Sequence, residues 1–156
     1  MMEERIQKAV ELFKSGYNCS QAVVAAFADM YGFTPEQALK MSSSFGGGIG
    51  RMRETCGAAC GLFMLAGLEK GCTDAKDREG KAANYALVQE LAAIFKERNG
   101  SLNCGELLGL KKETAIVSTP EERTPQYYAK RPCVKTVEEA AKIWVEYLEM
   151  QQKSKE

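Results

Sequence analysis

The sequence contains no histidine in its 156 residues. This absence excludes a Cys-His catalytic pair, a mixed Cys/His zinc site and the ligation of haem by a histidine of this chain. Apolar runs of about eighteen residues, which a membrane span needs, are missing as well. The amino-terminal stretch MMEERIQKAVELF is charged and lacks the apolar core of a signal peptide. We therefore expect a cytoplasmic protein that does not span a membrane.

An excess of charge is also absent, because 21 basic residues balance 21 acidic ones. A neutral chain has no global field that attracts nucleic acid, so we expect no nucleic-acid partner. Hydrophobic residues make up 45% of the chain and charged residues 27%, which is typical of a globular protein. The length suits one compact core, and we expect a single domain over residues 1–156.

Helical periodicity is the dominant pattern in the chain. Apolar residues recur every three or four positions in successive segments, and glycines such as Gly16 and Gly32 end the first two. Thr34, Pro35 and Gln37 form the sequence signature of a helix start with a capping box. Further helices are predicted at about 55–68 and 74–98, with a short helical turn near residue 104.

The last helix is predicted to begin at Thr136, with Glu139 closing a capping box. Before it, the segment 111–132 holds three of the four prolines and is interpreted as an extended connector. Only TAIVST, at 114–119, has the composition of a strand. The predicted fold class is all-α: a single compact helical bundle with an extended connector before the C-terminal helix.

The chain has six cysteines. A reducing cytoplasm disfavours a permanent disulfide framework, which leaves metal binding, transient redox chemistry or simple packing. Cys19, Cys56 and Cys104 each follow an Asn or Thr, residues favoured at the N-cap of a helix. In a first helical turn, the free amides and the helix dipole favour a thiolate, so we expect lowered pKa values there.

The other three cysteines differ in context. Cys133 follows Pro132 near the start of the last helix, and Cys60 shares a helix face with Cys56 one turn away. Cys72 follows a glycine at a helix end and is interpreted as incidental. A single cysteine is more often a buried space-filling residue than a functional one. The repeated N-cap context favours function for Cys19, Cys56 and Cys104 as a set.

The stretch SFGGGIGRMRETCGAACG allows two interpretations. Its glycines and its arginines, Arg51 and Arg53, could hold an anionic group at the start of a helix. Alternatively, bare backbone lets a bulky group or a neighbouring helix approach Cys56 closely. No dinucleotide or Walker-type motif accompanies the glycines, so close approach is favoured. The candidate cofactor-contacting residues are Gly47, Gly48, Gly57, Arg51 and Arg53.

With Cys19, CGAACG at 56–61, Cys104 and Cys133, the sequence resembles the C_GCAxxG_C_C family of putative redox-active proteins. The resemblance extends from GYNCSQAV to RPCVKTVEEAA. It implies that Cys19, Cys56, Cys104 and Cys133 are the family cysteines, hereafter the motif cysteines. Cys60 then occupies a variable position of the motif, and Cys72 is additional.

Three functions follow as hypotheses. The motif cysteines bind a metal, foremost an iron–sulfur cluster that transfers electrons to a redox partner protein. Alternatively, they exchange disulfides with Cys56 as the attacking thiol, or they only pack in a helical binding module, including a homo-oligomer. The first is slightly favoured, since four sites suit ligation better than a pair. Both redox hypotheses require folding to gather the motif cysteines into one pocket, with Cys72 outside it.

Overall fold

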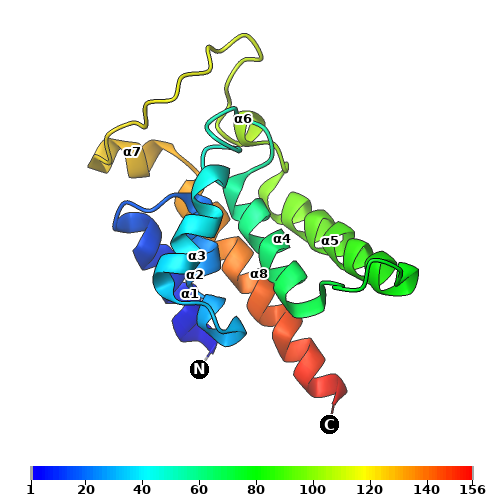
Figure 1. Ribbon diagram of the computed structural model, residues 1–156. Coiled ribbons are helices and arrows are strands. Elements are labelled where there is room, and N and C mark those ends of the chain that lie inside the picture. Colours follow the sequence, from blue (N-terminus) through cyan, green and yellow to red (C-terminus); the bar gives the residue numbers. More distant parts are fainter. Residues whose placement is uncertain (1, 156) are drawn as a thin grey trace.

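The computed structural model describes residues 2–155, which fold into helices and, over that range, contain no β-strand (Figure 1). Two short 3-10 helices are also present, η1 (Ala28–Tyr31) and η2 (Ser43–Phe45). The α-helices are α1 (Met2–Lys14), α2 (Cys19–Ala25), α3 (Pro35–Ser42), α4 (Gly57–Lys70), α5 (Arg78–Asn99), α6 (Cys104–Leu107), α7 (Pro125–Lys130) and α8 (Cys133–Ser154). The predicted all-α class is confirmed.

The short helix α2 lies at the centre of the core, and almost all of its residues are buried. Helices α1, α3, α4 and α8 pack around it. Helix α4 approaches closely because of its small residues: a Cβ atom at Gly61 would lie 3.0 Å from the Cβ of Val23. Large buried side chains from the surrounding helices, among them Phe13, Phe95 and Trp144, fill the rest of the core.

Local capping signals place several helix starts where the sequence predicts them. The Thr34 hydroxyl accepts a hydrogen bond from the Gln37 amide at 3.1 Å, and the Gln37 side chain accepts one from the Thr34 amide. Asn18 and Gln21 form the same capping box at the start of α2. Each box satisfies amides that a helix start leaves without a partner, and so it fixes where the helix begins.

The prediction for the last helix is wrong by one turn. Helix α8 begins at Cys133, directly after Pro132, and Thr136 lies inside its first turn. The Thr136 hydroxyl donates to the Cys133 carbonyl at 3.0 Å, so it does not cap the helix. Similarly, the helix predicted from about residue 74 begins at Arg78, capped by Asp77.

The segment 111–132 is not extended throughout, because it contains α7. Thr124 caps this helix, accepting from the Tyr127 amide at 3.1 Å, and Pro125 takes the first helical position. TAIVST forms no strand, since residues 2–155 offer it no other strand to pair with. None of the helices in these residues combines the length and the apolar run that a membrane crossing requires.

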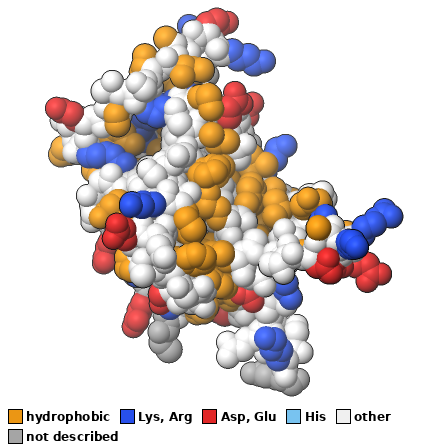
Figure 2. Space-filling view, viewed as in Figure 1, with side chains coloured by type: hydrophobic (Ala, Val, Ile, Leu, Met, Phe, Trp, Pro, Cys, Tyr) orange, Lys and Arg blue, Asp and Glu red, His pale blue; other side chains and the backbone are white. Residues whose placement is uncertain are grey.

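The amino ends of α2, α4, α6 and α8 lie at one end of the molecule, next to α7 (Figure 1). The segment between α6 and α7 arches away from this end. Hydrophobic side chains form a band along the face shown in Figure 2. The exposed large apolar residues of the chain include Met41 and Met52.

Candidate cysteine-lined site

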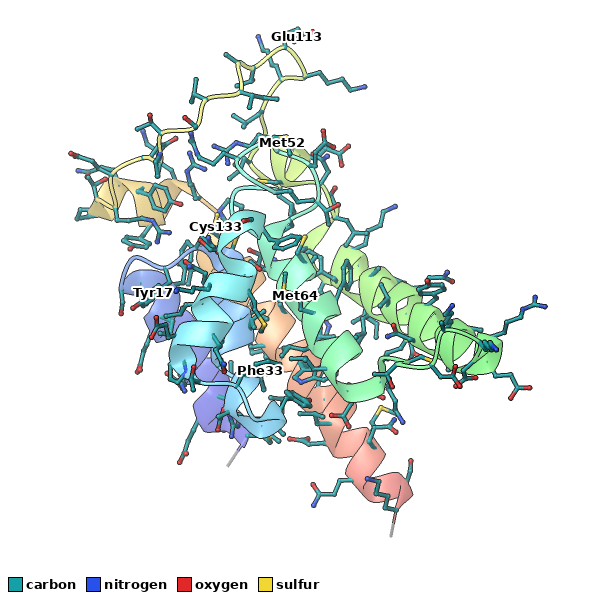
Figure 3. All side chains as sticks on the ribbon, viewed as in Figure 1. Tyr17, Phe33, Met52, Met64, Glu113 and Cys133 are labelled. Carbon is teal, nitrogen blue, oxygen red and sulfur yellow. The ribbon has the colours of Figure 1, made fainter. Side chains whose placement is uncertain are left out.

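The four motif cysteines line one cavity of about 60 Å³. Each lies at the amino end of a helix, so four helices converge on the cavity. Figure 3 shows Cys133 where the chain passes from α7 into α8. All six cysteines are free thiols. The cavity has room for roughly four water molecules at about 15 Å³ each.

The remaining two cysteines do not line this cavity. Cys60 lies in α4 with its sulfur 3.8 Å from the Thr55 carbonyl oxygen. Cys72 lies between α4 and α5, where its thiol donates to the carbonyl of Asp74 at 3.2 Å. The structure therefore places Cys72 outside the group, as predicted.

A short backbone bridge holds Cys56 and Cys104 near each other. Thr55 and Asn103 form an isolated antiparallel bridge. Beside it, the Cys56 amide donates to the Leu102 carbonyl at 2.6 Å. The Cys104 amide donates to the Glu54 carbonyl, also at 2.6 Å. Because Thr55 is held in the bridge, it does not cap α4 as predicted, and Cys56 itself takes the N-cap position.

Asparagine caps fix the other two helix starts that the sequence identified. The Asn103 side chain accepts from the Glu106 amide at 2.9 Å, which sets the start of α6 at Cys104. The Glu106 carboxylate accepts from the Ser101 hydroxyl at 2.5 Å instead of closing a capping box. Asn18 caps α2 and also donates to the Ser43 carbonyl at 2.9 Å, which ties α2 to the glycine-rich loop.

Two glycines are required by close approach to the thiols. A Cβ atom at Gly57 would lie 2.5 Å from the Cys19 sulfur, and one at Gly48 would lie 2.5 Å from the Cβ of Cys104. Gly48 also has a φ of 73°, which disfavours other residues. The interpretation that bare backbone allows close approach beside Cys56 therefore holds at Gly57, whereas Gly48 makes room for Cys104, which the sequence did not predict.

The loop backbone does not form a phosphate cradle. Residues 47–51 are all left-handed, with φ between 57° and 73°, and they include the β-branched Ile49. The amides of residues 49–54 donate to carbonyl groups of residues 44–49, within the same turn. These amides are therefore not available to an anion, although the amide of Gly47 faces the Cys19 sulfur and favours its thiolate.

The expected lowering of the thiol pKa values is wrong for Cys19 and Cys56. Burial raises the pKa of Cys56, and the neighbouring Cys19 raises it further, while the amides of Ala59 and Ala58 only partly oppose this. Burial, and then the proximity of Cys19 and Cys104, raises the pKa of Cys133 to about 12. Loss of hydration thus outweighs the helix ends, which sequence context alone could not weigh.

The same effect extends to the thiols of Cys19 and Cys60. Burial raises the pKa of Cys19, and the neighbouring Cys104 adds to the increase. Burial, and to a smaller extent the nearby Cys19, raises the pKa of Cys60 to about 11. Burial therefore favours the protonated form of the Cys19, Cys56 and Cys133 thiols.

The arginines lie elsewhere than the sequence suggested. Arg53 approaches Cys104, with a distance of 3.7 Å between its Nη1 and the sulfur, and not Cys56 as expected. Arg51 donates to the carbonyls of Val117 and Thr119 at 2.8 and 2.6 Å and does not line the cavity. Of the two, only Arg53 belongs to the thiol site.

Sequence reasoning missed Arg123 and Tyr127, which both line the cavity. The guanidinium groups of Arg123 and Arg131 each lie 4.9 Å from the centre of the Tyr127 ring, a cation–π arrangement. A usable signal existed, because Thr124-Pro125 repeats the helix-start pattern of Thr34-Pro35. Extending α7 from that signal would have placed Tyr127 and Arg131 on one face, next to Cys133.

Over residues 2–155, no three side chains of the metal-ligating types are arranged as around a metal ion. The motif cysteines nevertheless share a cavity. Their catalytic or ligating roles therefore remain predictions, as does the contact of Gly47, Gly48, Gly57, Arg51 and Arg53 with a cofactor.

Comparison with known proteins supports the family resemblance that the spacing of the cysteines indicated. The profile of a family described as "Putative redox-active protein (C_GCAxxG_C_C)" matches residues 17–147. An uncharacterized protein of Archaeoglobus fulgidus is 27% identical over 156 residues, which cover 96% of each chain. No solved structure matches the chain.

Proposed function

Because the chain belongs to the C_GCAxxG_C_C family of putative redox-active proteins, we propose that it is an electron-transfer protein. In this proposal Cys19, Cys56, Cys104 and Cys133 bind an iron–sulfur cluster. The observation that carries it is the single cavity lined by these four residues, which come from four separate helices. Four thiolates are the usual ligand set of such clusters.

Two features of the cavity support this proposal, the space beside one of its thiols and the chemistry of its donor atoms. At Gly57, a side chain would collide with the Cys19 sulfur, so the glycine leaves room for that sulfur to move. The donor set is purely thiolate, which suits soft metal centres and clusters. A closed structural zinc site would use the same ligands, but it would provide no redox chemistry.

The raised pKa values favour ligation over disulfide exchange. Attack on a disulfide requires a thiolate, and burial keeps the thiols of Cys56 and Cys133 protonated at neutral pH. A coordinated metal ion removes this obstacle, because a thiol that binds it is deprotonated. The same burial that hinders a nucleophile thus shields a cluster from water.

Nearby positive groups would balance the charge of four thiolates. Arg53, Arg123 and Arg131 all line the cavity, and the charges of Arg131 and Arg123 already favour the thiolate of Cys133. The Gly47 amide faces the Cys19 sulfur, and hydrogen bonds to ligating sulfurs raise a cluster's reduction potential. A bound cluster would accept and release one electron reversibly. A redox partner protein would donate or receive that electron. Free thiols accord with a location in the reducing cytoplasm.

The test is to purify the protein without oxygen and to measure iron, acid-labile sulfide and visible absorption. The wild-type protein should contain iron and sulfide in equal amounts. Replacing any motif cysteine by serine should remove most of the iron and the visible absorption. Cys60→Ser and Cys72→Ser are matched controls and should retain both.

A wild-type protein that stays free of iron and sulfide after reconstitution would overturn the cluster. In that case, titration with a mild oxidant decides between the remaining functions. If the wild-type protein loses two free thiols and the Cys56→Ser variant loses none, the protein exchanges disulfides. Retention of all thiols would leave the helical binding module.

A further inference from the structure

A second and larger cavity adjoins the cysteine-lined one. This cleft has a volume of about 490 Å³ and is lined by Arg51, Arg53, Arg123 and Arg131, with Glu121 as the acidic residue in its wall. Both cavities share several lining residues, among them Arg53 and Arg123. The cleft therefore lies directly against the cysteine site. Basic side chains also gather in Figure 2 on the side where Figure 1 places α7.

In the metal-free protein, the charges in this cleft are not balanced. Arg131 forms an ion pair with Glu121. Over residues 2–155, the other three arginines of the cleft have no carboxylate within ion-pair distance. Gathering four guanidinium groups in one concavity is unfavourable unless an anion offsets their charge. Consistent with this, burial, followed by the charge of Arg53, lowers the pKa of Arg51.

The arginines are held in place by neutral partners. Arg51 donates to the carbonyls of Val117 and Thr119 through one nitrogen, Nη1. Arg123 donates to the carbonyls of Phe13 and Tyr17, at 2.8 and 2.9 Å. Carbonyl groups fix a guanidinium without neutralising it, so these contacts orient positive charge and leave it uncompensated.

We propose that this cleft binds a small oxyanion that carries two or more negative charges, such as a phosphate group. Recognition comes from the arginine side chains, whose planar guanidinium groups pair with two oxygens of such an anion. The glycine-rich loop contributes shape rather than donors, because the amides of residues 49–54 are already used within the turn.

The shape of the cleft favours a small molecule over an acidic protein surface. Residues 118–121 of the arching segment and residues 43–53 both contribute to its lining. A concave site between two backbone segments encloses a compact anion, whereas a protein surface would need a flatter and more exposed set of charges.

The test uses metal-free, reduced protein, so its outcome is independent of whether the cysteines bind a cluster. Binding of pyrophosphate is measured by titration calorimetry at low salt. Wild type should bind saturably, and Arg51→Gln should weaken binding at least about tenfold, as expected when an arginine–phosphate pair is lost. Glu121→Gln should strengthen it, because this carboxylate competes for Arg131. Arg78→Gln, an exposed arginine of α5, is the matched control and should bind like wild type.

Three results would overturn the proposal. The first is the absence of saturable pyrophosphate binding by the wild-type protein. The second is equal binding by Arg51→Gln and Arg78→Gln. The third is binding of a polyglutamate peptide without binding of pyrophosphate, which would assign the cleft to an acidic protein partner.

Discussion

At the scale of single residues, Gly57 is one of the positions beside the motif cysteines that have no room for a side chain. Its missing side chain leaves the space that the Cys19 sulfur occupies, at 2.5 Å from a hypothetical Cβ, and the Phe45 carbonyl lies only 2.8 Å away. Backbone cannot yield as a flexible side chain can, so an added methyl group must displace the sulfur or the helix. The sequence indicated this role for Gly57 correctly.

We predict that Gly57→Ala weakens metal binding roughly 10- to 100-fold, the range seen when the support of a metal ligand is disturbed. Gly67→Ala is a matched control in the same helix, because a Cβ there meets nothing within 4 Å. It should stabilise the fold slightly, since alanine is the better helix former. Iron content and urea unfolding of both variants check this. Equal iron content in the two variants would show that Gly57 serves helix packing alone.

At the scale of elements, the sequence predicted helix starts well where one side chain caps one amide. The capping boxes at Asn18 and Thr34 form as expected. The prediction failed for α4 and α8, whose starts depend on longer-range structure: the bridge that holds Thr55, and the turn after Pro132. Contacts between distant segments are not encoded in local spacing, so the sequence could not show them.

The first turn of α8 shows how environment overrides the helix end. An unfolded thiol has a pKa near 9, whereas burial raises the pKa of Cys133 to about 12. Between these values the unfolded chain has released a proton that the folded protein keeps. Stability therefore falls as pH rises from about 9 to about 12, by up to about 1.4 kcal/mol per pH unit for this group.

We predict that Cys133→Ser makes the stability of the metal-free, reduced protein fall less steeply above about pH 9. Urea unfolding at several values between about pH 8 and about pH 10.5 measures this slope. Cys60→Ser should have a nearly equal effect over this range, because the pKa of Cys60, at about 11, also lies above it. An identical slope for Cys133→Ser and wild type would contradict the assignment of this proton to Cys133.

At the scale of the whole molecule, the sequence predicted which cysteines gather but not what surrounds them. Cys19, Cys56, Cys104 and Cys133 meet because the helices that they start converge at one end of the bundle. Burial and the arrangement of the arginines arise from packing between segments far apart in the chain. Arg123, for example, donates to the carbonyls of Phe13 and Tyr17. No local sequence pattern predicts these contacts.

The part of the chain between Cys104 and Cys133 is the least anchored by packing. Helix α7 has no buried residue, and α6 has only Cys104 and Gly105 buried. Most residues between these two helices are exposed. A cluster bound by the motif cysteines would tie both ends of this segment to α2 and α4, which are well packed in the core.

We therefore predict that removing the metal increases amide hydrogen exchange over residues 104–131, while the amides in the middle of α4 change little. The reason is that α4 packs against α2, α5 and α8 without help from a metal, whereas the arching segment would lose its anchors. Exchange followed by mass spectrometry on the metal-bound and metal-free protein measures the difference. Cys72→Ser, which leaves every motif cysteine in place, should show the same change as wild type on metal removal. Unchanged exchange over 104–131 in a protein that demonstrably loses its metal would mean that Cys104 and Cys133 do not hold it.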